Sequence, residues 1–186
     1  HLRDRYAGVE RADSLVMDPH KWWFAPFDSA ALIYRDPRLA KAVHTQDASY
    51  LDVIHEDDED FNPSDLAYHL TRRARGMALW FSMAVNGLDA YRDAVDHSLA
   101  LARYAAARID EDPDLHLIRE PDLSVVLFRR VGWLHADYEA WGQRLLHEQT
   151  AFVTHSAWRG ETVGRLVFLH PATTTEMVDE VLTTLG

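Results

Sequence analysis

The sequence predicts an α/β protein with short strands near the N-terminus, a long helical stretch in the middle and a small α+β layer at the C-terminus. Three observations lead to this prediction. Two short apolar runs near the N-terminus are bounded by proline and aspartate, which is typical of buried strands. Apolar residues recur at helical spacing from Leu66 to about Ile109. The remaining patterns follow the order β-β-α-β-β-α, which is typical of an antiparallel sheet covered by helices.

The N-terminal part of the chain predicts two strands and a helix. The first strand is expected over residues 14–18, where a brief apolar run ends at Pro19. The second strand is expected over residues 29–35. A helix should follow, because Asp36 is a good N-cap residue and Pro37 suits the first helical position.

A long loop separates this part from the central helix. Residues 44–65 carry no sustained apolar period, and loops of that length inside a compact domain are usually functional or mobile. The helical pattern then begins at Leu66. The dipeptide Asn86-Gly87 is a stop signal within it.

The last third of the chain predicts four strands and two helices. The final helix should be capped by a threonine, and Glu176 lies early enough for a capping box. The strands are expected at 115–120, 122–130, 151–157 and 163–170, and the helices at 136–149 and 173–185.

The composition narrows the class of protein. The 186 residues include no cysteine, which excludes disulfides, thiolate metal sites and cysteine nucleophiles, and indicates a cytoplasmic protein. No apolar run is long enough to cross a bilayer, so no membrane partner is expected. The net charge of -11 disfavours binding to nucleic acid, because the phosphate backbone would be repelled.

No metal site is predicted. Asp58, Asp60 and Asn62 fit the first ligand positions of an EF-hand loop. Pro63 and His69 stand where that loop needs glycine and glutamate, so the pattern fails. A solvated acidic loop is the better interpretation.

The residues around Lys21 suggest chemistry at its amine. Lys21 follows His20 and precedes Trp22, Trp23 and Phe24. A lysine that attacks a carbonyl must be neutral, and burial among apolar side chains disfavours the charged form. These aromatic residues are expected to supply such burial at the end of the first strand. The ordinary alternative is a lysine whose stem or charge packs on a tryptophan ring.

The same stretch resembles the Schiff-base segment of the group II pyridoxal-phosphate-dependent amino-acid decarboxylases, a family that includes aromatic-L-amino-acid, histidine, glutamate and diaminobutyrate decarboxylases. The resemblance covers essentially the whole chain, and the order and extent of the matches make it specific. The matching residues are Ala12-Asp13-Ser14, His20-Lys21-Trp22, Pro26-Phe27-Asp28-Ser29 with Ala31, Tyr50-Leu51, 72–81, Gly87 and 165–174.

The resemblance implies a fold type I, PLP-dependent transferase-like enzyme that decarboxylates an L-amino acid to the amine and carbon dioxide. Lys21 would bind pyridoxal 5'-phosphate as a Schiff base, and His20 would contact the cofactor phosphate. The alternative for His20 is a hydrogen-bonded residue behind the site. Asp18 stands where some relatives have asparagine, and its charge would be unfavourable beside a phosphate, so it is expected to point elsewhere.

Two further residues gain expected roles from the resemblance. Tyr50 would be the proton donor to the quinonoid after carbon dioxide leaves, since family decarboxylases carry a tyrosine followed by leucine here. An ordinary loop aromatic is the alternative. Arg165 would bind the substrate carboxylate, for which a guanidinium is well shaped, unless it forms a structural ion pair.

The resemblance also implies that the chain is the C-terminal half of such an enzyme. Residues 1–78 would then end the large cofactor-binding domain, with the catalytic loop at 44–65, and residues 79–186 would form the small α+β domain. The expected partners are the N-terminal half of the same enzyme, a second copy in a homodimer, and a small-molecule amino acid.

Other functions are compatible with the same sequence. Phenylalanine in place of the loop tyrosine accompanies oxidative chemistry in the family, so an oxidative deaminase or aldehyde synthase is the main alternative. A non-enzymatic remnant is another. The substrate is not identified: the acidic loop favours a basic side chain, whereas the tryptophan-rich segment favours an aromatic one.

Overall fold

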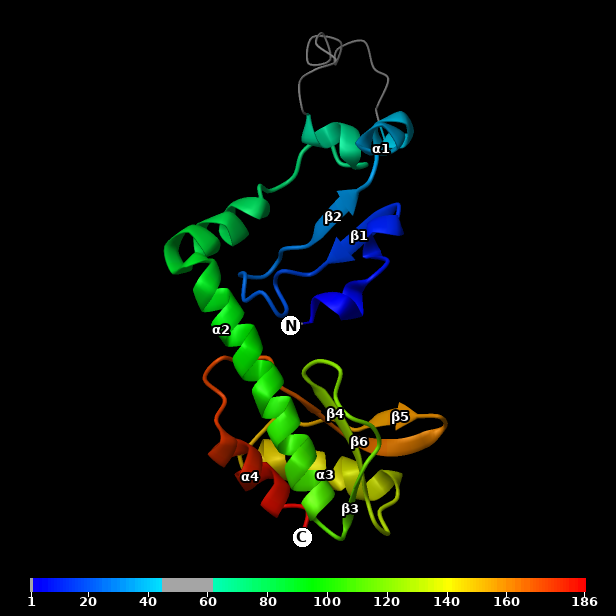
Figure 1. The fold of residues 1–186 in the computed structure, drawn as a ribbon, viewed down its shortest axis with the longest axis vertical. Helices are drawn as coiled ribbons and strands as arrows, with labels where there is room; N and C mark the ends of the chain where they lie inside the picture. The colour runs from blue at the N-terminus through cyan, green and yellow to red at the C-terminus, as the bar shows by residue number, and fades with distance from the viewer. Residues whose placement is uncertain (1, 45–61) are drawn as a thin grey trace. The chain divides into compact units, whose positions relative to one another are not determined.

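The computed structural model describes residues 2–44 and 62–186 of the chain. The chain divides into two compact units, His1–Val85 and Asn86–Gly186 (Figure 1). The division lies within one long helix, α2 (Gly76–Glu111). None of the helices in the described ranges combines the length and apolarity that crossing a bilayer would need.

The N-terminal unit is built on two antiparallel strands. β1 (Ser14–Met17) and β2 (Ala31–Tyr34) pair with Ser14 opposite Tyr34 and Met17 opposite Ala31. Both strands form where the apolar runs predict them. Their register brings the end of β1 beside the start of β2, so the residues between them must turn back on themselves.

A short helix follows the strand pair. α1 (Pro37–His44) begins at the predicted proline, and the Arg38 N–H donates to Asp36 Oδ1 at 3.1 Å, which satisfies one free donor of the first turn. Beyond the residues that are not described, α1 lies against a single turn of 3₁₀ helix at Pro63–Leu66.

The central helix begins later than the apolar pattern predicts. α2 starts at Gly76, so the prediction of helix from Leu66 is wrong. The segment before Gly76 is held by side-chain contacts instead, because Arg72 donates to the Pro63 carbonyl at 3.0 Å and Arg75 binds Asp28 at 2.8 Å. Inside α2, Gly87 has φ 77° and ψ 160°, which breaks the helix at the predicted stop signal.

The C-terminal unit is an antiparallel sheet covered by helices, as predicted. Its strands lie in the order β3-β4-β6-β5, and every neighbouring pair is antiparallel. β5 is shorter than the sequence suggests, since residues 151–155 are not in a strand. The elements are β3 (Leu115–Leu117), β4 (Val125–Arg130), α3 (His135–His147), β5 (Ser156–Trp158), β6 (Glu161–Val167) and α4 (Thr175–Thr183).

The hydrophobic core of this unit lies between the sheet and its helices. Alternation along β4 points Val126 and Phe128 into the core, and both are fully buried. They meet Ile109 of α2, Leu145 of α3 and Val178 of α4 in one apolar cluster. This cluster fixes the three helices on the sheet, because burying its side chains is the main stabilising term.

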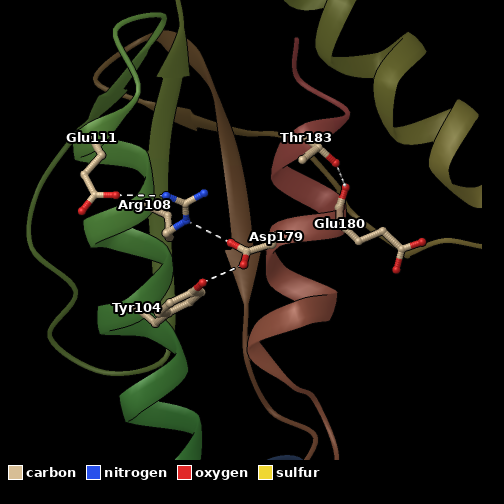
Figure 2. Close-up of polar contacts among 6 residues, drawn as sticks. All are labelled: Tyr104, Arg108, Glu111, Asp179, Glu180 and Thr183. Atoms are coloured by element: carbon tan, nitrogen blue, oxygen red, sulfur yellow. Dashed lines mark hydrogen bonds and ion pairs between the residues drawn. The ribbon is translucent and has the colours of Figure 1, made fainter.

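A polar cluster joins α2 to α4 at the edge of this core (Figure 2). Asp179 lies at its centre: Tyr104 Oη donates to one carboxylate oxygen at 2.7 Å, and Arg108 Nε donates to the other at 3.0 Å. These two donors lower the pKa of Asp179 below its ordinary value. Arg108 also binds Glu111 at 3.0 Å, which orients the guanidinium along α2.

The start of α4 differs in detail from the prediction. Thr174 caps the helix, and its hydroxyl accepts a hydrogen bond from the Met177 N–H at 3.4 Å. Met177 is therefore the third helical residue. Glu176 is the second, so the predicted capping box does not form.

We predict that Gly164→Ala destabilises the C-terminal unit by about 1–3 kcal/mol, as overpacking of a full core does. Gly164 pairs with Phe128 across β6 and β4, and a methyl group on Gly164 would overlap the buried Phe128 ring. Chemical denaturation measures the change. Gly76→Ala is the control, since that glycine has open space around it. Equal stability of the two variants would contradict the packing argument.

We predict that Asp179→Asn makes the protein less sensitive to acid. Folding lowers the pKa of Asp179, so its stabilising effect is complete above the ordinary value of 3.8 and is lost as the pH falls through the folded-state value. The asparagine variant should start less stable at neutral pH and lose less stability on acidification. Thermal unfolding across this pH range measures the difference.

The matched control is Glu180→Gln. Glu180 is the next residue on α4, and its carboxylate points away from the cluster (Figure 2). This variant should keep the acid sensitivity of the parent protein. The stabilising role of Asp179 is refuted if the two variants respond to acid alike.

Candidate functional site

The end of β1 leads directly into a tight turn that carries the candidate site. The Lys21 N–H donates to the Asp18 carbonyl at 3.0 Å, which closes a four-residue turn immediately after the strand. The Ala25 N–H then donates to the Pro19 carbonyl at 3.0 Å and continues the tight course of the chain. Lys21 and His20 are therefore fixed by backbone hydrogen bonds close to the sheet.

The Lys21 amine is bound by a carboxylate and is not covered by the aromatic residues. Its Nζ lies 2.5 Å from Asp18 Oδ2, and the lysine side chain remains 64% exposed. The expectation that Trp22, Trp23 and Phe24 bury the amine is wrong for this chain. Burying a charged ammonium among apolar rings costs free energy, whereas an exposed ammonium stays hydrated and can pair with a carboxylate one turn away. The ion pair also lowers the pKa of Asp18.

His20 is held by the backbone of Ser29 on the segment that returns to β2. The Ser29 N–H donates to His20 Nδ1 at 3.1 Å, and the Ser29 carbonyl lies against the same nitrogen and accepts from the His20 N–H at 3.3 Å. The Phe27 ring meets the imidazole edge-on at 5.3 Å. Nδ1 is thus occupied, and Nε2 makes no recorded contact within the described part of the chain.

The indole N–H of Trp22 is a further candidate donor, in addition to His20 Nε2. Its indole Nε1 is buried, and no acceptor lies within reach among residues 2–44 and 62–186. A buried N–H that makes no hydrogen bond is costly, so native proteins usually supply an acceptor. This donor therefore suits an acceptor that the described residues do not provide.

The loop is tied to the segment before α2 by one ion pair. Arg75 Nε donates to Asp28 Oδ2 at 2.8 Å and lowers the pKa of that carboxyl group. Sequence reasoning missed this contact, and it also missed the role of the Ser29 backbone. Asp28 and Ser29 belong to the matched motif, but nothing in the sequence indicates which atoms they bind.

Arg165 lies in the other unit, on the face of β6 that points away from the core. It is half-buried and lines a cavity of about 550 Å³ with Thr150, Phe152 and Leu169. Within the described ranges its guanidinium has no ion pair, so nothing there supports the structural ion pair that the sequence left open. Tyr50 falls outside the described residues.

The residues after β1 fit a phosphorylated aldehyde cofactor. Lys21 presents an accessible primary amine, which is the group that forms a Schiff base with an aldehyde. Among the described residues, His20 Nε2 and the indole N–H of Trp22 have no partner, and ring nitrogens that carry hydrogen are donors of the kind that phosphate oxygens accept. The charge of Asp18 is balanced by the Lys21 amine that its carboxylate binds.

Known proteins that are similar to this chain belong to one family. Residues 1–131 match the family model described as the pyridoxal-dependent decarboxylase conserved domain. An aromatic-L-amino-acid decarboxylase of Bacillus atrophaeus is 28% identical over 183 residues, which are 94% of this chain and 38% of that protein. The chain therefore spans well under half of the length of this relative.

Solved structures share the fold over nearly the whole chain. The structure of Oryza sativa TDC with PLP and tryptamine matches with a TM-score of 0.87 at 23% identity. The match covers 99% of this chain and 41% of the Oryza sativa chain. The Rhodiola rosea 4-hydroxyphenylacetaldehyde synthase matches with a TM-score of 0.82 at 17% identity. That match covers 98% of this chain and 38% of the synthase chain. The fold is thus that of fold type I PLP-dependent enzymes. With most of its length matched by the family model, this chain belongs to the pyridoxal-dependent decarboxylase family.

Proposed function

We propose that the protein containing this chain decarboxylates an L-amino acid to the corresponding amine and carbon dioxide. The observation that carries the proposal is the accessible Lys21 amine just after β1, beside a histidine whose Nε2 has no partner among the described residues, in a chain of this family. Bound pyridoxal phosphate would supply an aldehyde carbon for Lys21 and a ring that draws electrons from the reacting centre.

The residues after β1 would hold and orient the cofactor. Lys21 would form the covalent bond through Nζ, after leaving its ion pair with Asp18. His20 would donate from Nε2 to the phosphate, and the Ser29 backbone would keep its ring from turning away. Trp22 would donate its indole N–H to the same group or to protein beside it.

Two residues outside this loop would act on the substrate. Arg165 lines a cavity, its guanidinium forms no ion pair with the described residues, and it would hold the substrate carboxylate through paired N–H donors. Tyr50 would return a proton from its hydroxyl to the α-carbon after carbon dioxide leaves, while closure around it excludes water. Both roles follow from the family resemblance.

The N-terminal unit also supports a requirement for further protein. Adjacent residues of a strand point to opposite faces, and Leu15 and Val16 are 38% and 64% exposed, while Leu32 and Ile33 are 49% and 52% exposed. The strand pair therefore presents apolar side chains on both faces, which is typical of a sheet covered on both sides. We infer that the N-terminal half of the enzyme supplies these layers, and that a homodimer completes the site.

Oxidative chemistry is the second candidate. The fold does not distinguish the two reactions, since the 4-hydroxyphenylacetaldehyde synthase shares it with a TM-score of 0.82. Tyr50 favours simple decarboxylation, because a phenol can deliver the proton that completes the reaction. A protein that binds no cofactor would instead be a non-enzymatic remnant.

We predict that Lys21→Arg abolishes covalent cofactor uptake by the full protein. Arginine keeps the positive charge but cannot form the Schiff base, so the visible absorption that borohydride removes should disappear. Absorption spectra and mass analysis of the reduced protein measure the bound cofactor. Release of carbon dioxide from a panel of L-amino acids should be lost at the same time, and the panel also identifies the substrate.

Lys41→Arg is the matched control, because Lys41 is the other lysine of the chain and pairs with Asp65 at 3.6 Å. It should retain the absorption. Full uptake by the Lys21 variant, or none by the parent protein with its N-terminal half present, would refute the proposed function.

We predict that Tyr50→Phe lowers amine formation by about 10²- to 10⁴-fold, the usual contribution of a positioned proton donor. Oxygen consumption and aldehyde release should rise relative to amine release. Oxygen electrode measurements and product analysis on the identified substrate give the ratio. Unchanged amine formation would show that another group delivers the proton, and oxygen use by the parent protein would favour the second candidate.

A further inference from the structure

The contact between Asp18 and Lys21 is built into the turn after β1. The backbone bond from the Lys21 N–H to the Asp18 carbonyl places the two residues one turn apart, and their side chains meet at 2.5 Å. The lysine side chain is 64% exposed and that of the aspartate 32%, so the pair is reachable from solvent. Because backbone and side chains both link the same two residues, the position of the amine is set by Asp18.

The charges around the pair leave Lys21 as the partner of Asp18. His20 is the only other ionisable group in the described part of the chain that favours the charged form of this carboxylate. On the returning segment, Asp28 is bound by Arg75 at 2.8 Å and so does not compete for the amine. The ion pair therefore consists of one carboxylate and one ammonium.

An ammonium cannot react with an aldehyde until it releases a proton. That proton goes to solvent, and the freed lone pair then forms the bond to the aldehyde carbon. The aldehyde oxygen leaves as water with the two hydrogens that remain on the nitrogen, which leaves a carbon–nitrogen double bond. A carboxylate that stabilises the ammonium opposes the first of these steps.

Resting on the function proposed above, we propose that Asp18 is a positioning residue that holds the Lys21 amine as an ion-paired ammonium and slows its capture of aldehydes near neutral pH. The unloaded lysine is thereby shielded from stray carbonyl compounds while it stays correctly placed. Asp18 does not touch the reacting carbon and acts only through the lysine.

The test compares Asp18→Asn with the parent in the full, cofactor-free protein. One measurement follows reductive methylation of Lys21 by formaldehyde and cyanoborohydride, read by peptide mass spectrometry over a range of pH. The other follows the rate of uptake of pyridoxal phosphate by absorption. Asp36→Asn is the matched control, because Asp36 is also 32% exposed and ion-paired, but its partner is Arg38.

Asp18→Asn should be methylated at Lys21, and should take up pyridoxal phosphate, roughly two- to fivefold faster near neutral pH, as expected when an exposed ion pair is removed. The difference should shrink as the pH rises through and beyond about 10.4, the ordinary pKa of lysine, because the ammonium that Asp18 binds is then lost. Equal rates near neutral pH, or a change of the same size at every pH, would overturn the inference, since a purely steric role does not depend on charge. Faster methylation in a protein that takes up no pyridoxal phosphate would uphold the role of Asp18 and refute the proposed function.

Discussion

The backbone of Ser29 holds the imidazole of His20, and the geometry of the candidate site depends on this contact. The strand register places Met17 opposite Ala31, so the loop between β1 and β2 leaves and re-enters the sheet at the same edge. The Ser29 N–H donates to His20 Nδ1 and the Ser29 carbonyl accepts from the His20 N–H, and these two bonds close the loop at that edge. Lys21 is the next residue, so the strand pair and the closed loop set the position of its backbone.

Closure of the loop by backbone atoms has a chemical consequence. The contact occupies Nδ1 of His20 and leaves Nε2 for an external acceptor. A side-chain partner would have been free to rotate, whereas a backbone partner moves only with the sheet. Two residues after His20, the Trp22 indole N–H is buried and the described residues offer it no acceptor. A group that fills this place would therefore meet donors that are already oriented, which reduces the entropy lost on binding.

Local signals in the sequence predicted the elements that position the site, and non-local contacts account for what they missed. The apolar runs and the Asp36-Pro37 pair gave β1, β2 and α1, because strands bounded by proline and capped helices depend on neighbouring residues. The start of α2 was missed because Arg75 binds Asp28, 47 residues earlier, and such a contact leaves no periodic trace. The sequence motif singled out Lys21 as the candidate Schiff-base lysine. The motif could not predict how exposed its side chain is, because exposure depends on the protein that surrounds it.

The two units differ in how completely they bury their own apolar surface, and this difference bears on where activity resides. The described apolar core cluster runs from Leu101 to Leu185 and lies wholly within the C-terminal unit, which also carries the polar cluster around Asp179. The N-terminal unit leaves both faces of its strand pair exposed, and Lys21 extends from the end of that pair. Covering those faces would lower the effective dielectric around the lysine and strengthen every charge interaction there. The interaction between Asp18 and Lys21 is therefore weakest in the exposed chain and becomes stronger as further protein covers it. Assembly of the enzyme and control of its lysine are thus physically linked.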